Sequence, residues 1–170
     1  MKGIWLGVLL LGAAMGSARA DNGSTHAEHA AARSQLQSFV DSFRASISSK
    51  NGAKLASMFL PETRFVSVYD DETFRSLKAK RPSASKVLVT DSKKFTDFVS
   101  TSPKPLEERF TNIRIDTDGT VATVQFNYGF YNGGALTNDG VETWQLVNSE
   151  SGWKISAMLF SVRLVPGLMH

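Results

Sequence analysis

Cysteine is absent from the 170 residues, and histidine occurs only three times, as His26, His29 and His170. Without cysteine the chain cannot form a disulfide framework, a thiolate nucleophile or a cysteine-ligated metal site. No histidine occurs between residues 30 and 169. We therefore expect neither a histidine general base nor a three-histidine metal centre in the folded body.

Two of the histidines are close together near the N-terminus. His26 and His29 are three residues apart, which would place two imidazoles on one face of a helix. Two ligands on a fraying terminus make a weak metal site. We therefore expect a solvated segment here, and no metal or cofactor in the protein.

The excess of basic over acidic residues is small. Lysine and arginine number 19 and aspartate and glutamate 16, for a formal charge of +3. Residues 78–94 are locally basic, but acidic residues flank them and no aromatic residue is interleaved. Nucleic-acid-binding surfaces combine clustered basic residues with a strongly positive domain charge. We expect a solvated surface and no nucleic-acid partner.

The first 20 residues have the pattern of a secretory signal peptide. Lys2 supplies the positive start, residues 4–15 are apolar or small, and Ala18-Arg19-Ala20 fits the small-x-small cleavage rule. A membrane span needs about 20 apolar residues, and this run is shorter. We expect cleavage before Asp21, export to the periplasm or secretion, and no stable membrane anchor afterwards. Cleavage removes two basic residues and no acidic one, which lowers the formal charge from +3 to +1.

Helical periodicity dominates the first half of the mature chain. Residues 21–32 are polar and alanine-rich and are expected to form a flexible leader. The next segment, residues 33–49, carries one apolar stripe made of Leu36, Phe39, Val40, Phe43 and Ile47. A short second helix is predicted over 53–59, ended by Pro61, and a third over 92–100, capped by Asp91.

The spacing of the apolar residues then changes from the helical period of 3.6 residues to the strand period of two. Strands are predicted over residues 64–69, 86–89, 109–116, 120–131, 140–148 and 153–164. Residues 70–85 are polar and contain Pro82, so we expect a loop with little fixed structure.

The strand over 120–131 has two distinct faces. Its apolar row consists of Ala122, Val124, Phe126, Tyr128 and Phe130, and its polar row contains Thr123, Gln125 and Asn127. Helices followed by antiparallel strands indicate an α+β fold. The apolar row is expected to face the helices, and the polar row to face water or another subunit.

This order of elements, together with particular residues, resembles the nuclear transport factor 2-like superfamily on its SnoaL-like side. The matching residues are the second helix with its Leu-Ala-Ser-Met-Phe-Leu-Pro end (55–61), the strand 64–69, residues 140–144, and Gly152-Trp153-Lys154-Ile155 with Ser161. The resemblance covers residues 33–165, taken as one domain. It implies a curved antiparallel sheet wrapped around three N-terminal helices as a cone, whose open end is often a ligand pocket. Homodimerisation through the sheet is common in this superfamily.

The resemblance also bears on catalysis. Ketosteroid-isomerase-like members carry an aspartate base on the first strand, and the matching position falls near Ser67, which cannot act as a carboxylate base. Asp70 and Asp71 lie three and four residues further on and are the remaining catalytic candidates, together with Tyr128.

Many SnoaL-like members also carry two histidines on the last strand. The matching positions are Ala157 and Leu159. The resemblance thus implies that two polar pocket positions have become aliphatic, which argues against an enzyme.

An apolar, aromatic interior remains as the feature to explain. The expected ligand-binding residues are Tyr69, Phe126, Tyr128, Phe130, Trp144, Met158 and Phe160. Glu142 is expected near the pocket, beside Trp144, as an exposed charge, with a catalytic role as the alternative. The favoured function is an exported, non-catalytic module that binds a small apolar or aromatic molecule in the cone. An enzyme of isomerase or dehydratase type and a homodimeric protein-interaction module stay open as alternatives.

Overall fold

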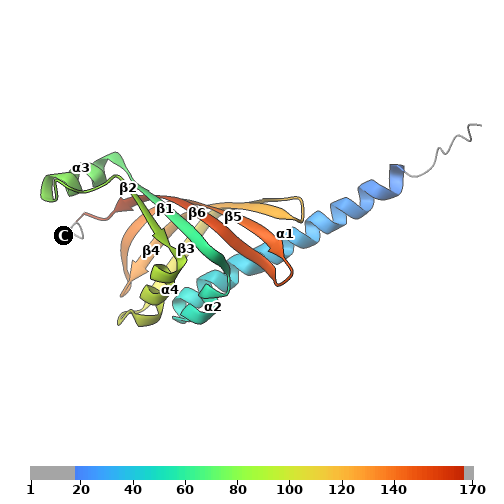
Figure 1. The fold of residues 1–170 in the computed structure, drawn as a ribbon, viewed down its shortest axis with the longest axis horizontal. Coiled ribbons are helices and arrows are strands. Elements are labelled where there is room, and N and C mark those ends of the chain that lie inside the picture. Colours follow the sequence, from blue (N-terminus) through green and yellow to red (C-terminus); the bar gives the residue numbers. More distant parts are fainter. Residues whose placement is uncertain (1–17, 167–170) are drawn as a thin grey trace, which may run out of the picture.

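The computed structural model of the protein describes residues 18–166, with side chains from residue 26 (Figure 1). Most of the expected signal peptide, residues 1–17, lies outside the described residues, as does His170. Within the described part of the chain, no helix has the length and apolar character needed to cross a bilayer.

One six-stranded sheet forms the body of the protein. The strands are β1 (Phe59–Tyr69), β2 (Val87–Asp91), β3 (Leu106–Thr117), β4 (Val121–Asn132), β5 (Ala135–Ser149) and β6 (Gly152–Leu164). Their spatial order is β2-β1-β6-β5-β4-β3. All neighbours pair antiparallel except β1 and β6, which pair parallel. The curved sheet with N-terminal helices confirms the predicted α+β fold.

The long helix α1 (Ala18–Ser48) lies against one face of this sheet, and its N-terminal part extends past the sheet edge (Figure 1). Its predicted apolar stripe is the part that packs: Leu36, Val40, Phe43 and Ile47 are fully buried. The helix begins well before Arg33, so the segment expected as a leader is helical and continuous with the stripe.

Two short helices close the end of the sheet next to the C-terminus of α1. They are α2 (Gly52–Ala56) and α4 (Ser92–Thr101). A Cβ atom at Gly52 would lie 1.9 Å from Ser100 Oγ and 2.6 Å from Thr96 O, so only glycine allows this close approach. The predicted cap of α4 is confirmed, because the Asp91 side chain accepts a hydrogen bond from Lys94 N at 2.9 Å.

Residues 71–80 correct the sequence interpretation. The loop predicted over 70–85 is wrong, because Asp71–Lys80 form helix α3. Asp70 caps this helix by accepting from Thr73 N at 2.8 Å, and Leu77 is buried beneath it. The cap, the buried Leu77 and the buried Thr73, which accepts from Leu164 N, all support a helix in a segment whose polar composition and Pro82 favoured a loop.

The two faces of the sheet have the predicted character. Ala122, Val124, Phe126 and Tyr128 of β4 are buried, whereas Thr123, Gln125 and Asn127 are exposed. One end of the buried face is filled with rings, namely Phe43, Phe110, Phe126 and Trp144. The Phe110 and Phe126 centroids are 3.9 Å apart, and those of Phe43 and Trp144 are 4.6 Å apart. We call this cluster the filled end; the same face is hollow at its other end.

Candidate functional site

The hollow end of the inner face forms a pocket of about 200 Å³, which we call the cone pocket. Its lining residues come from α4 and from every strand except β2. They are Phe65, Phe95, Phe98, Glu108, Tyr128, Phe130, Asn138, Glu142, Met158 and Phe160. A cavity of roughly this size accommodates one benzene-sized molecule.

Two buried glutamates lie on this mainly apolar wall. Glu108 is 7% exposed and Glu142 is 3% exposed. Glu108 lies opposite Phe130 in the β3–β4 ladder, and Glu142 lies opposite Phe126 and Phe160 in the ladders on either side of β5. Strand alternation puts both carboxyl groups on the face that carries the core, because each is two residues from a buried aromatic residue.

The contacts of the two carboxyl groups leave their charge without a cationic partner. Glu142 accepts a hydrogen bond from Trp144 Nε1 at 2.5 Å. Arg44 is a cation that acts on the Glu108 charge, but its Nε donates to the Glu108 main-chain oxygen at 3.5 Å and not to the carboxyl group. Among the ion pairs of the described residues, none includes either glutamate.

The surroundings of both glutamates favour the protonated form. Burial raises the pKa of Glu142 to about 7. Burial also raises the pKa of Glu108 well above its ordinary value, and repulsion from the Glu142 carboxylate raises it further, against a smaller opposing effect of Arg44. A carboxyl group taken out of water beside a second carboxyl group keeps its proton to higher pH. The pair therefore retains a proton close to neutral pH.

Tyr128 contributes its ring and a fixed hydroxyl group to the pocket. The hydroxyl oxygen lies 3.0 Å from Asn138 Oδ1 and 2.9 Å from Ser161 O, and both neighbours are acceptors. Burial, followed by the nearby Glu142, raises the pKa of the Tyr128 hydroxyl. Tyr128 is therefore neutral, and its proton is already engaged within the protein.

The predicted ligand-binding residues divide into three groups. Tyr128, Phe130, Met158 and Phe160 line the cone pocket. Phe126 and Trp144 are fully buried in the filled end, although Trp144 contacts the pocket residue Glu142 through its indole N–H. Tyr69 lies at the end of β1, away from the pocket lining, and its backbone N–H donates to Lys86 O.

The predicted catalytic aspartates lie outside the cone pocket. Asp70 is the cap of α3, and Asp71 forms an ion pair with Lys86. These contacts lower the pKa of both side chains, with Thr73 as the main cause for Asp70 and Lys86 for Asp71. Neither aspartate lines the cone pocket. Asp70 and Tyr128 do line a separate open hollow together with Arg163, but there Asp70 is engaged as the cap of α3.

The inference drawn from Ala157 and Leu159 is also wrong. Leu159 is 55% exposed and lies opposite Thr143 on the outer face of the sheet. The β5–β6 register shifts between Gln145 and Leu146, and the resulting bulge in β6 reverses which side chains point inward. After the bulge, Met158 is the inward residue, so an aliphatic Leu159 removes nothing from the pocket.

Sequence reasoning missed the most polar part of the site. Glu142 was expected to be exposed, which is wrong, and Glu108 was not recognised at all. The pocket residues Phe65, Phe95, Phe98 and Asn138 were not recognised either. The signal was present in the alternation: Glu108 lies in phase with Leu106 and Phe110, which are buried. A charge on the apolar phase of a strand is the pattern that identifies both glutamates.

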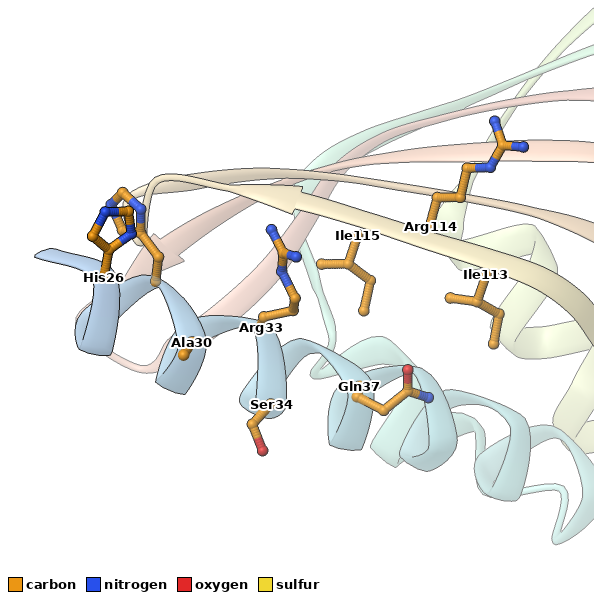
Figure 2. Close-up of a pocket in the computed structure, with 9 residues that line it drawn as sticks. His26, Ala30, Arg33, Ser34, Gln37, Ile113, Arg114 and Ile115 are labelled. Atoms are coloured by element: carbon orange, nitrogen blue, oxygen red, sulfur yellow. The ribbon is translucent and has the colours of Figure 1, made fainter.

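A second hollow is an open groove between α1 and β3 (Figure 2). His26 and Arg33 line it from the helix and Ile113, Arg114 and Ile115 from the strand. The isoleucines point toward the helix, but Arg114 points away from it (Figure 2). The basic groups therefore do not converge on one point. No group of three or more metal-binding side chains occurs among the residues that the structure describes.

Comparison with known proteins agrees with this architecture. A family model described as "SnoaL-like domain" matches residues 36–165. No curated protein matches the chain.

Several solved structures share the fold at low sequence identity. An NTF2-like protein from Cytophaga hutchinsonii is 10% identical, with a TM-score of 0.59 over 77% of this chain and 98% of that one. A candidate scytalone dehydratase from Novosphingobium aromaticivorans is 12% identical, with a TM-score of 0.61 over 82% and 89%. A cystatin-like-fold protein of unknown function from Nostoc punctiforme is 10% identical, with a TM-score of 0.55 over 80% and 92%. At these identities the likeness establishes the fold alone.

Proposed function

The chain belongs to the SnoaL-like domain family, and on that premise we propose that its cone pocket binds one small, largely apolar or aromatic molecule that carries a polar group. The observation behind this proposal is the combination of a phenylalanine-rich wall with two buried carboxyl groups. Ligand sites are typically apolar hollows with a few well-placed polar groups.

Energetics favours a functional origin for the two glutamates. Removing a carboxylate from water is costly unless it is paired and hydrogen-bonded. Well-packed apolar residues often replace buried charges without loss of stability. Glu108 and Glu142 have no cationic partner among the described residues. A ligand with a polar group supplies the partner that the protein itself does not.

Adjacent residues of β6 provide a matched test of this proposal. Phe160 lines the cone pocket, and its neighbour Leu159 faces outward. Benzyl alcohol is the probe, and tryptophan fluorescence is the signal because Trp144 contacts Glu142. We expect saturable binding that Phe160→Ala weakens at least fivefold and Leu159→Ala leaves unchanged. Absence of saturable binding, or equal effects of the two variants, would contradict the proposal.

The carboxyl pair favours an acid–base enzyme as the second candidate. A carboxyl with a pKa of about 7 is matched to proton transfer at neutral pH. Glu108, which keeps its proton to higher pH, would supply the proton and the Glu142 carboxylate would receive one, in an isomerase or dehydratase type of reaction. The fold neighbour from Novosphingobium aromaticivorans carries the name of a dehydratase.

Solvent exchange tests this second candidate without knowledge of the substrate. In D₂O, a carboxylate that removes a proton beside a ketone leaves an enolate, which then takes up a deuteron. We expect deuterium to enter cyclohexanone faster with the protein than in buffer, and Glu142→Gln to abolish the difference. If deuterium enters at the same rate as in buffer, the enzyme candidate is refuted and only the binding function remains.

Export is part of the same proposal. The positive start, the apolar run and Ala18-Arg19-Ala20 support a cleaved signal peptide. Expression in a bacterial host with intact-mass measurement of the periplasmic fraction tests this, with a mature N-terminus at Asp21 as the expected result. A full-length chain confined to the cytoplasm would contradict it.

A further inference from the structure

We propose that the molecule taken by the cone pocket is a small organic cation, an amine or quaternary ammonium group carried on an aromatic or apolar body. This inference rests on the proposed function and narrows the ligand class of the same pocket. The geometry that carries it is two carboxyl groups facing a hollow surrounded by phenylalanine rings.

The charges around the pocket are of one sign. Its lining includes Glu108 and Glu142 and no lysine, arginine or histidine. Arg44, the cation that acts on Glu108, makes its own contacts elsewhere: its guanidinium lies 5.8 Å from the centre of the Phe110 ring and 3.7 Å from an Asp41 oxygen. The pocket therefore offers negative charge that no ion pair of the described residues neutralises, and Arg44 offsets it only in part at Glu108.

The wall of the pocket suits the same ligand charge. Five phenylalanine rings line it: Phe65, Phe95, Phe98, Phe130 and Phe160. They contact one another across elements, with centroids 5.7 Å apart for Phe65 and Phe95 and 6.1 Å apart for Phe98 and Phe130. The faces of aromatic rings attract cations, and the attraction grows when water is excluded. Rings and carboxyl groups thus favour the same kind of ligand.

Other ligand charges fit this pocket less well. An anion would be repelled by the carboxylates and by the ring faces. A neutral molecule would fill the apolar space but leave one buried carboxylate without a counter-charge. An ammonium group donates hydrogen bonds to carboxylate oxygens and supplies that counter-charge. The volume of about 200 Å³ limits its body to roughly one ring.

Three probes of similar shape and different charge test the inference: benzylamine, benzyl alcohol and benzoate. Their affinities for the full chain are measured by calorimetry at pH 7.5 and low salt. We expect benzylamine to bind at least tenfold more tightly than benzyl alcohol, with benzoate the weakest. The double variant Glu108→Gln, Glu142→Gln should bind amine and alcohol equally.

A matched control separates the pocket from overall charge. The double variant Asp70→Asn, Asp71→Asn removes the same formal charge outside the pocket, and asparagine also caps helices well. It should keep the preference for the amine. Circular dichroism establishes that both double variants are folded.

Three outcomes would overturn the inference in distinguishable ways. Equal binding of amine and alcohol to the unmodified chain would refute the cationic ligand and leave the proposed binding function standing. Failure of every probe to bind would refute both. A preference for the amine that survives in the Glu108→Gln, Glu142→Gln variant would show that the carboxyl pair is not its source.

Discussion

The filled end and the cone pocket are built from the same strands. Along a strand, the inward-facing residues of the two regions are only two positions apart. On β3 the inward residue changes from Phe110 in the filled end to Glu108 in the pocket, and on β5 it changes from Trp144 to Glu142. In one region the inward side chains pack against one another, and in the other they surround a hollow. Stability and chemistry are thus concentrated at opposite ends of one sheet face.

The helices explain the difference between the two regions. Phe43 of α1 reaches the filled end and contacts Trp144, Phe110 and Phe59. At the other end α4 contributes the helical part of the pocket lining, with Phe95 half-buried and Phe98 43% exposed. A long apolar stripe fills one end of the face, whereas one short helix leaves the other end open.

The largest expected loss of stability comes from truncating a buried side chain in the filled end. Phe43→Ala removes a fully buried ring with four aromatic neighbours and should lower the free energy of unfolding by about 3–5 kcal/mol. Phe160→Ala, at a position that already faces a hollow, should cost less than half as much. Urea unfolding of both variants checks this prediction. Equal losses of unfolding free energy would contradict the claim that one region is packed and the other hollow.

The next effect is the dependence of stability on pH, which should originate in the pocket. The ordinary pKa of Glu142 is 4.5 and its value in the folded protein is about 7. The folded state holds this proton to higher pH than the unfolded chain, so the associated stability is complete below pH 4.5 and is lost as pH rises through 7. The loss is on the order of 3 kcal/mol.

A variant without the carboxyl pair provides the control for this pH dependence. Glu108→Gln, Glu142→Gln cannot lose protons at these positions, so its free energy of unfolding should be nearly flat from pH 5 to 8. Urea unfolding across this range measures both proteins. If the free energy of unfolding of the double variant falls equally, the pH dependence does not come from the pocket glutamates.

A smaller effect is expected at the acidic residue outside both regions. Asp70→Ala removes the cap of α3 and should cost about 1 kcal/mol in urea unfolding. Its affinity for benzyl alcohol should not change, because Asp70 does not line the cone pocket. If the variant stays folded but no longer binds benzyl alcohol, Asp70 contributes to the ligand site after all.

The smallest effect on stability is expected on the outer face. Leu159 is 55% exposed, so Leu159→Ser should change the free energy of unfolding of the monomer by less than about 0.5 kcal/mol. The homodimer expected from the resemblance stays a prediction, and light scattering tests it through the mass in solution. If a dimer forms through this face, Leu159→Asp should halve that mass; an unchanged dimer would place the contact elsewhere.

The comparison of the two regions also shows what the sequence could reveal. The stripe from Leu36 to Ile47 and the apolar row of β4 have strict periods, and both pack as predicted. These features depend on local repetition, which a single sequence displays directly. They were sufficient to predict the α+β fold and the buried faces of α1 and β4, but Phe126 and Trp144 were expected in a ligand site and not in the filled end.

The pocket depends on features that periodicity alone does not reveal. A bulge in β6 decides that Met158 and not Leu159 points inward, and it follows from pairing with β5. The carboxyl pair arises because β4 holds β3 and β5 apart at a distance that brings Glu108 near Glu142, residues 34 positions apart in the chain. Long-range register determines such a site. Sequence reasoning therefore named four of the residues that line the pocket but did not recognise the buried carboxyl pair.

The protonation state of the pair tests the central claim most directly. Carbon-13 NMR of the protein labelled at the glutamate side-chain carboxyl groups follows each one through a pH titration. We predict two signals that titrate well above the others, one of them near pH 7, and that are absent from the Glu108→Gln, Glu142→Gln variant. If every glutamate signal titrates near the ordinary pKa of 4.5, the cone pocket does not hold a proton near neutral pH, which contradicts the buried carboxyl pair proposed as its recognition element.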